Sequence, residues 1–352
     1  MQFLLISTFI IIIHYINGNK ISNNIEKING NKISNNIEKI NLNKISNNIE
    51  KINLNKIYKM AILSKTIYDY DFNNKNKKDS LCLLSKFDLK NNLSIDTIKT
   101  NNIYFNTEQY VSYLNTENFS KEAKNYLDFI SNNFPDTEIY GYFNNKNRLH
   151  SLIIINHKIE EINIVFRGSM YFDEWINNLL IKESSIPFNN LKIHSGILKL
   201  YKHNDINNNI LYILKNLFEY FPKYKKIFGG HSKGTILSFL TIIDLLYILD
   251  YDYTYEVICF GSPQILNKNI ADFLHNNDKI KISNVINEND IICNLPFNNK
   301  YQVGLEILMK NNDIMINEYD KPYNSKINVF NNFFKSISNH DLKKYIHKLK
   351  KY

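Results

Sequence analysis

The chain has 352 residues, 44% of them apolar, so it is long and apolar enough to build one large hydrophobic core or two smaller ones. Its formal net charge of +9 includes no focused basic run, and residues 19–56 carry seven Lys and three Glu. Because zinc-like Cys and His spacing is also missing, the composition argues against nucleic-acid binding. The three cysteines, Cys82, Cys259 and Cys293, are odd in number and far apart, so they predict no disulfide framework.

The N-terminal residues have the pattern of a secretory signal. The apolar run from Phe3 to Ile13 is shorter than the roughly 20 residues that a membrane-spanning helix needs. It fits the apolar core of a signal peptide, with Gly18 as the small residue at the cleavage site. We therefore expect residues 1–18 to be a signal peptide and the protein to be secreted or lumenal. An uncleaved anchor and a buried N-terminal strand are the alternatives.

A twelve-residue unit rich in Asn, Lys and Ile follows, and it occurs three times from Asn19 to Leu54. Twelve helical steps of about 100° turn each copy by roughly 120° relative to the one before, so the isoleucines spread around a straight helix. A helix formed by this tract would have no single apolar face that could pack against a folded domain. We interpret residues 19–57 as a disordered linker, with a spacer or an adhesion arm as the alternative.

From Tyr58 the pattern becomes that of one domain, residues 58–352. Helices are predicted near Met60–Tyr70 and over Glu108–Ser131, and a short basic helix over Asp341–Lys350. The predicted strands are Thr137–Phe143, Leu149–Asn156, Ile162–Phe166, Lys225–Phe228, Glu256–Phe260 and Lys279–Ile286, followed by a hairpin of Tyr301–Met309 and Ile314–Glu318. Because helical stretches alternate with the later strands, the pattern predicts an α/β fold with a mostly parallel sheet and helices on both faces.

One motif on these elements carries chemistry. The residues Gly230-His231-Ser232-Lys233-Gly234 follow a short apolar strand and precede Thr235–Leu249, whose apolar residues recur at helical spacing. This G-x-S-x-G pattern between a strand and a helix is typical of a nucleophile elbow, a sharp turn that exposes a reactive serine. Ser232 is therefore the candidate nucleophile.

A serine nucleophile needs a histidine as its base and an acid to orient that histidine. On this fold the acid and then the histidine follow the serine in the chain. Asp290 comes just after a predicted strand, and His340 lies in a loop before the last helix. By contrast, His275 precedes Asp290, and His347 lies among lysines within the last helix. Asp244 and Asp250 fall within or at the end of the helix after the motif, so the order of the residues together with their placement selects Asp290 and His340.

Several further segments, in the same order along the chain, resemble the class 3 or fungal-type lipases of the α/β-hydrolase fold from about Thr137 to Tyr345. The matching segments are Ile164-Val165-Phe166-Arg167-Gly168-Ser169, Glu174-Trp175 with Leu179, His194-Ser195-Gly196-Ile197 with Tyr201, Phe260-Gly261-Ser262-Pro263, Asn289-Asp290 with Leu295-Pro296, and His340 with Tyr345. The resemblance implies an α/β-hydrolase fold and a triad of Ser232, Asp290 and His340.

The resemblance also implies an oxyanion hole, formed by Ser169 and by the backbone N–H of Lys233. It implies no metal and no organic cofactor. Lys233 and Thr235 depart from the commonest family pattern. We hypothesise that the Lys233 ammonium favours substrates with an acidic head group. Arg167 is interpreted as a structural ion-pair partner and Trp175 as a core residue, and residues Met170–Phe188 as the cover of the site.

The predicted function is hydrolysis of lipid esters through an acyl-enzyme, by a triacylglycerol lipase or a phospholipase A1-like enzyme. The expected partner is a lipid ester substrate at a membrane or lipid-droplet surface, and the oligomeric state stays open. The alternative is a catalytically silent hydrolase-fold protein that binds lipid or a host partner.

Overall fold

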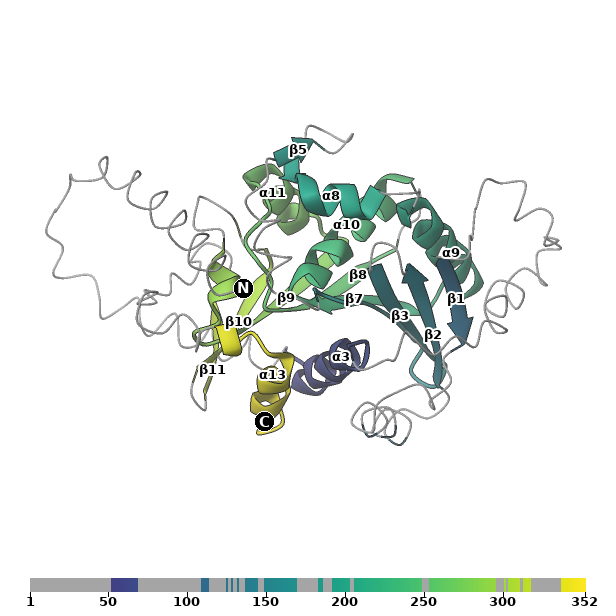
Figure 1. The fold of residues 1–352 in the computed structure, drawn as a ribbon. Coiled ribbons are helices and arrows are strands. Elements are labelled where there is room, and N and C mark those ends of the chain that lie inside the picture. Colours follow the sequence, from purple (N-terminus) through teal and green to yellow (C-terminus); the bar gives the residue numbers. More distant parts are fainter. Residues whose placement is uncertain are drawn as a thin grey trace, which may run out of the picture. The chain divides into compact units, whose positions relative to one another are not determined.

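One large sheet with helices on both faces forms the described part of the protein (Figure 1). The computed structural model describes residues 52–68, 109–113, 125, 128, 132, 137–144, 149–169, 183–185, 192–202, 206–248, 253–295, 301, 303–310, 313–317 and 337–352. All of these residues lie in one unit, Ile52–Tyr352. The predicted signal peptide and most of the predicted linker lie outside the described residues. No helix among the described residues is long and apolar enough to cross a membrane.

Nine strands of the described chain form the large sheet, and their order follows the sequence. They are β1 (Gln109–Tyr113), β2 (Thr137–Asn144), β3 (Leu149–Asn156), β4 (Glu161–Phe166), β7 (Lys225–His231), β8 (Tyr255–Phe260), β9 (Ile280–Asn287), β10 (Leu305–Lys310) and β11 (Asp313–Asn317). Neighbours from β4 to β10 run parallel, whereas the pairs at both ends are antiparallel. The predicted α/β-hydrolase fold with a parallel central sheet is confirmed. A separate antiparallel pair consists of β5 (Glu183–Ser185) and β6 (Lys192–His194).

Two groups of helices cover the two faces of the sheet (Figure 1). The helices are α3 (Leu54–Thr66), α8 (Ser195–Lys202), α9 (Ile206–Tyr220), α10 (Lys233–Ile248), α11 (Lys268–Asn276) and α13 (Leu342–Leu349), with a short 3₁₀ helix η4 (Ile291–Asn294). Helices α3 and α13 share one face and pack against each other. Helices α8, α9, α10 and α11 belong to the core on the other face.

All six residues of strand β4 are buried, because helices cover both faces of the sheet. Ile162, Ile164 and Phe166 join the core beneath α10, and Val165 joins the core beneath α3. The strand pairs antiparallel with β3 and parallel with β7, so the parallel part of the sheet begins here. Its one charged residue, Glu161, is buried against Lys59 of α3.

The predicted helix Glu108–Ser131 is wrong at its start, because Gln109–Tyr113 is a strand that pairs with β2 at the edge of the sheet. Its sequence, Gln-Tyr-Val-Ser-Tyr, contains the aromatic and β-branched residues that favour strands. Helical periodicity alone does not separate so short a segment from a helix. The strand partner decides the structure here.

Helix α3 begins at Leu54, four residues before the predicted domain boundary at Tyr58. Ile57, which was assigned to the linker, is 3% exposed in the core. The helix is also tied to the sheet by charges, since Lys59 Nζ lies 3.0 Å from Glu161 Oε2 and Lys56 pairs with Glu256. The folded unit therefore includes the last residues of the predicted linker.

Strand β7 extends to His231, three residues beyond the predicted end at Phe228. The sequence pattern underestimated it because Gly229 and Gly230 have no side chain to signal a strand. Both glycines are required by close packing: a Cβ at Gly229 would lie 2.6 Å from the Met60 sulfur, and one at Gly230 would lie 2.7 Å from the Gly234 carbonyl carbon. The extension brings the strand directly to Ser232.

Candidate active site

Ser232 occupies the turn between β7 and α10, in a backbone conformation that few non-glycine residues adopt. Its φ angle is +58°, which costs energy in an L-residue and is a feature of strained functional turns. The turn is held by a hydrogen bond from the Ser232 N–H to the Phe260 carbonyl, at 2.9 Å. A Cβ at Gly234 would collide with the Phe166 carbonyl. Both glycines of the motif therefore lie where backbone segments pack too closely to leave room for a Cβ.

Thr235 replaces the small residue that is common at its position, and it adds a brace to the turn. Its hydroxyl donates to the Ser232 carbonyl at 2.7 Å and is hydrogen-bonded to the Ser262 hydroxyl at 2.9 Å. All three groups are buried. This departure from the family pattern therefore links the serine turn to the segment after β8.

Asp290 lies three residues after the end of β9 and is 1% exposed. One carboxylate oxygen caps the helix η4 by accepting from the Ile292 N–H at 2.9 Å. The other accepts from His340 Nδ1 at 2.8 Å and from the Tyr345 hydroxyl at 2.5 Å. Burial by itself raises the pKa of this carboxyl, but His340 and these hydrogen bonds outweigh burial and hold the pKa below its usual value. Asp290 is therefore a buried carboxylate with donors on both oxygens.

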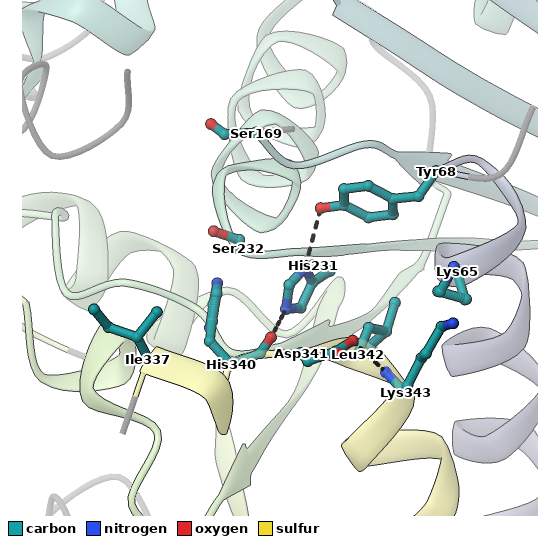
Figure 2. A pocket seen from close by; sticks show the side chains of 10 residues that line it. All are labelled: Lys65, Tyr68, Ser169, His231, Ser232, Ile337, His340, Asp341, Leu342 and Lys343. Carbon is teal, nitrogen blue, oxygen red and sulfur yellow. Dashed lines mark hydrogen bonds between the residues drawn. The ribbon is translucent and has the colours of Figure 1, made fainter. Parts of the chain in front are cut away.

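His340 stands in the turn before α13, and its ring connects Asp290 with the serine. Its Nδ1 is bound to Asp290, whereas its buried Nε2 has no hydrogen-bond partner among the described residues. Figure 2 shows the ring directed toward Ser232. Ser232 and His340 line the same pocket, whose volume is about 390 Å³. The structure thus brings together the three residues that chain order selected.

The two predicted oxyanion residues lie close to Ser232 in the fold, one in the segment after β4 and the other directly after Ser232 in the chain. Ser169 follows β4 and lines the pocket beside Ser232 (Figure 2). Lys233 is the first residue of α10, so its N–H belongs to the helix N-terminus, where the helix dipole favours negative charge. The Lys233 side chain is half-buried and is not among the described residues that line the pocket.

The remaining sequence assignments around the site have different outcomes. Arg167 is buried, and its N–H donates to the His150 carbonyl. Trp175 lies outside the described residues, as does the predicted cover Met170–Phe188 apart from β5. His275 and His347 lie within α11 and α13 and do not line the pocket, which agrees with their rejection. Among the described residues, no group of three or more His, Cys, Asp and Glu side chains is arranged to hold a metal.

Asn287 and Tyr345 are supporting residues whose contacts the sequence did not reveal. Asn287 Nδ2 donates to the Asn339 carbonyl at 2.7 Å, next to His340. Tyr345, one turn into α13, reaches the Asp290 carboxylate. Tyr345 belongs to the histidine segment of the family resemblance, and its five-residue spacing from His340 is the sequence signal for this contact. Asn287, in a chain so rich in asparagine, gave no such signal.

A strained serine turn and a buried acid–histidine pair at the carboxyl edge of a parallel sheet are features of the α/β-hydrolases. Comparison with known proteins agrees, since residues 163–300 match the family described as lipase (class 3). The predicted resemblance to that family is confirmed over this region.

The individual relatives are distant. A lipase of Rhizomucor miehei is 28% identical over 138 residues, which are 38% of this chain and 37% of the relative, so the match spans little more than a third of the relative. The solved structure of a lipase from Rhizopus microsporus var. chinensis has a TM-score of 0.52 and 21% identity, and covers 62% of this chain and 76% of that one. Lipase II from Rhizopus niveus also has a TM-score of 0.52 and 21% identity, over 62% and 82% of the two chains. These structures show the shared fold.

Proposed function

We propose that the protein hydrolyses carboxylic esters of lipids through an acyl-enzyme on Ser232. The observation that carries the proposal is that Ser232 and His340, from two separate turns, line one pocket, and that Asp290, from a third turn, is hydrogen-bonded to His340 behind it. The match of residues 163–300 to the class 3 lipases supports it. The triacylglycerol lipase and phospholipase A1-like reactions use the same three residues and differ in the ester that the pocket accepts.

In the proposed mechanism, Ser232 Oγ attacks the ester carbonyl carbon while His340 Nε2 takes the hydroxyl proton. The carboxylate of Asp290 holds the proton on His340 Nδ1 and stabilises the imidazolium that forms. The N–H groups of Ser169 and Lys233 bind the developing oxyanion, and each well-placed donor of this kind lowers the barrier by about 3–4 kcal/mol. The C–O bond to the leaving alcohol then breaks, and His340 returns the proton to that oxygen.

Water completes the cycle. His340 removes a proton from a water molecule, whose oxygen attacks the acyl carbon on Ser232. Collapse of the second tetrahedral intermediate releases the carboxylic acid, and the proton returns to Ser232. The expected meeting place with substrate is a membrane or lipid-droplet surface, in a secreted or lumenal setting.

The substrate class is tested on the full-length chain with three esters: a p-nitrophenyl ester, triolein emulsion and phosphatidylcholine vesicles, each with and without detergent. Release of fatty acid from triolein alone identifies a triacylglycerol lipase, and release from phosphatidylcholine identifies a phospholipase. The Lys233→Leu variant, measured on vesicles of anionic phosphatidylglycerol and of phosphatidylcholine, checks whether a preference for the anionic ester depends on that ammonium. Absence of hydrolysis of all three esters contradicts the proposal and favours a silent hydrolase-fold protein that binds lipid.

Gly261→Ala is expected to lower kcat/KM by about 10²-fold, the scale of a misplacement of about 1 Å at a reacting group. Gly261 has φ +58°, and a Cβ there would lie 2.8 Å from His340 Cε1, 2.9 Å from His340 Nδ1 and 3.0 Å from Asp290 Oδ2. The added methyl group therefore pushes His340 from its position. Steady-state kinetics with the p-nitrophenyl ester measure the effect.

Gly304→Ala is the matched control for Gly261→Ala. Gly304 has φ +76°, and its Cβ would crowd Ile282 instead of the pocket. Both variants carry the cost of a left-handed alanine, about 1–2 kcal/mol, and are expected to lose stability in urea unfolding. Equal kinetic losses in the two variants contradict the assignment of His340.

A further inference from the structure

Tyr68, just beyond the end of α3, reaches into the candidate active site. Its hydroxyl lies 3.0 Å from His231 Nδ1, and it lines the pocket that holds Ser232 (Figure 2). The opposite ring nitrogen, His231 Nε2, lies 2.7 Å from the carbonyl oxygen of His340. Tyr68 and His231 are thus linked by hydrogen bonds to the turn that carries the proposed base.

The direction of these hydrogen bonds follows from the groups themselves. A carbonyl only accepts, so His231 Nε2 carries a proton and donates it to His340. Burial and the neighbouring His340 ring lower the pKa of His231 to about 3, although Asp290 opposes them, so the ring is neutral near pH 7. Its Nδ1 is then an acceptor, and Tyr68 is the donor. Burial raises the pKa of the Tyr68 phenol, so the phenol keeps the proton that it donates.

The same phenol oxygen also contacts the oxyanion turn. The space for this contact exists because residue 168 is glycine: a Cβ there would collide with the Tyr68 hydroxyl oxygen and would lie 2.5 Å from the His231 carbonyl oxygen. Hydrogen bonds therefore run from Tyr68 through His231 to the carbonyl of His340, and the Tyr68 hydroxyl packs against Gly168.

These contacts join three turns of the candidate site. Gly168 precedes the oxyanion residue Ser169, His231 precedes Ser232, and His340 is the proposed base. The rings of His231 and His340 also pack together, with centroids 4.4 Å apart and planes at 33°. Connected hydrogen bonds in a buried setting strengthen one another and fix the groups they link.

We infer that Tyr68 is a positioning residue, whose hydroxyl acts through His231 to hold the oxyanion turn and the His340 turn in register around Ser232. The inference rests on the proposed ester hydrolysis. Its consequence is that α3 is a working part of the active site and not merely a cover on the sheet. A fragment that begins at Tyr58 lacks the first turn of α3 and is expected to be a poor enzyme.

The test is Tyr68→Phe in the full-length chain, which removes the hydroxyl and keeps the ring. We expect kcat to fall about 10- to 100-fold with KM changed less than about twofold, because alignment for the reaction is lost while the pocket is not. The rate of Ser232 labelling by a fluorophosphonate is expected to fall by the same factor. Tyr58→Phe, the same change at a position within α3, is the control and is expected to leave both rates within about twofold of wild type.

A second variant separates positioning from stability. His231→Leu breaks the same series of hydrogen bonds. The double variant is therefore expected to lose about as much kcat as the more impaired single variant, and not the product of the two losses. Thermal unfolding is measured for each protein. The inference is overturned if Tyr68→Phe keeps wild-type kcat, if its loss follows the melting temperature alone, or if the two losses multiply.

The same experiment distinguishes the inference from the proposed function. Hydrolysis and labelling by wild type, both absent in Ser232→Ala, support the proposed function whatever Tyr68→Phe does. A wild-type protein that neither hydrolyses esters nor takes the label overturns the proposed function and, with it, the role of Tyr68.

Discussion

Ser232→Ala is expected to lower kcat about 10⁴- to 10⁶-fold for every ester that the protein hydrolyses, because removing the nucleophile of a triad leaves only the oxyanion donors and substrate binding. The fold is expected to persist. Alanine removes one hydroxyl from a turn whose described hydrogen bonds use the Ser232 backbone. Single-turnover kinetics with a p-nitrophenyl ester, and the loss of fluorophosphonate labelling, measure the effect.

Ser283→Ala is the matched control for this variant. Ser283 lies half-buried in β9 and does not line the pocket, so its hydroxyl is expected to be dispensable for hydrolysis. Its kcat is expected to stay within about twofold of wild type, since it touches none of the groups that act on the ester. Retention of more than about 1% of wild-type kcat in Ser232→Ala would be incompatible with a triad nucleophile.

Asp290→Asn is expected to lower kcat about 10⁴-fold, the loss that follows when the orienting acid of a triad becomes an amide. The carboxylate accepts from His340 and Tyr345 on one oxygen and from the Ile292 N–H on the other. An amide cannot accept on both sides. If its NH₂ faces His340, the ring is held as the tautomer that cannot take the Ser232 proton. If it faces Ile292, two donors meet in a buried site.

The control for this variant is Asp244→Asn, which changes another buried acid that follows Ser232 in the chain. Asp244 lies inside α10 and is 4% exposed. Its replacement is expected to cost stability and to leave kcat within about twofold of wild type, because it does not line the pocket. An Asp290→Asn enzyme as active as Asp244→Asn would remove Asp290 from the mechanism.

The candidate site was predictable wherever the chemistry depends on residues in a fixed order along the chain. The G-x-S-x-G pattern marked Ser232, and the requirement for an acid and then a histidine selected Asp290 and His340. Ser232 and Asp290 follow β7 and β9, and parallel strands bring their carboxyl ends to one edge of the sheet. His340 precedes helix α13 instead, so its place beside Asp290 depends on the packing of that helix.

The errors and omissions have one cause. The sequence pattern predicts a helix where Gln109–Tyr113 is a strand, starts helix α3 too late and ends β7 before its glycines. In each case the deciding contact is with a segment distant in sequence: β2, the sheet beneath α3, or the Met60 side chain. The local sequence pattern reflects the intrinsic preference of a segment for helix or strand, whereas these contacts depend on the residues that pack against the segment in the folded protein.

The sequence by itself determined the class of fold and pointed to the three residues that we propose form the triad, because covered strands need apolar side chains and the elbow needs its glycines. Only the tertiary structure revealed that Tyr68, 164 positions before Ser232, hydrogen-bonds to His231. It also decided that His231 is a neutral donor to His340 and not a rival base. The physical reason is that a side chain's hydrogen-bond partner and its pKa are set by the groups packed around it, and for these residues those groups come from opposite ends of the chain.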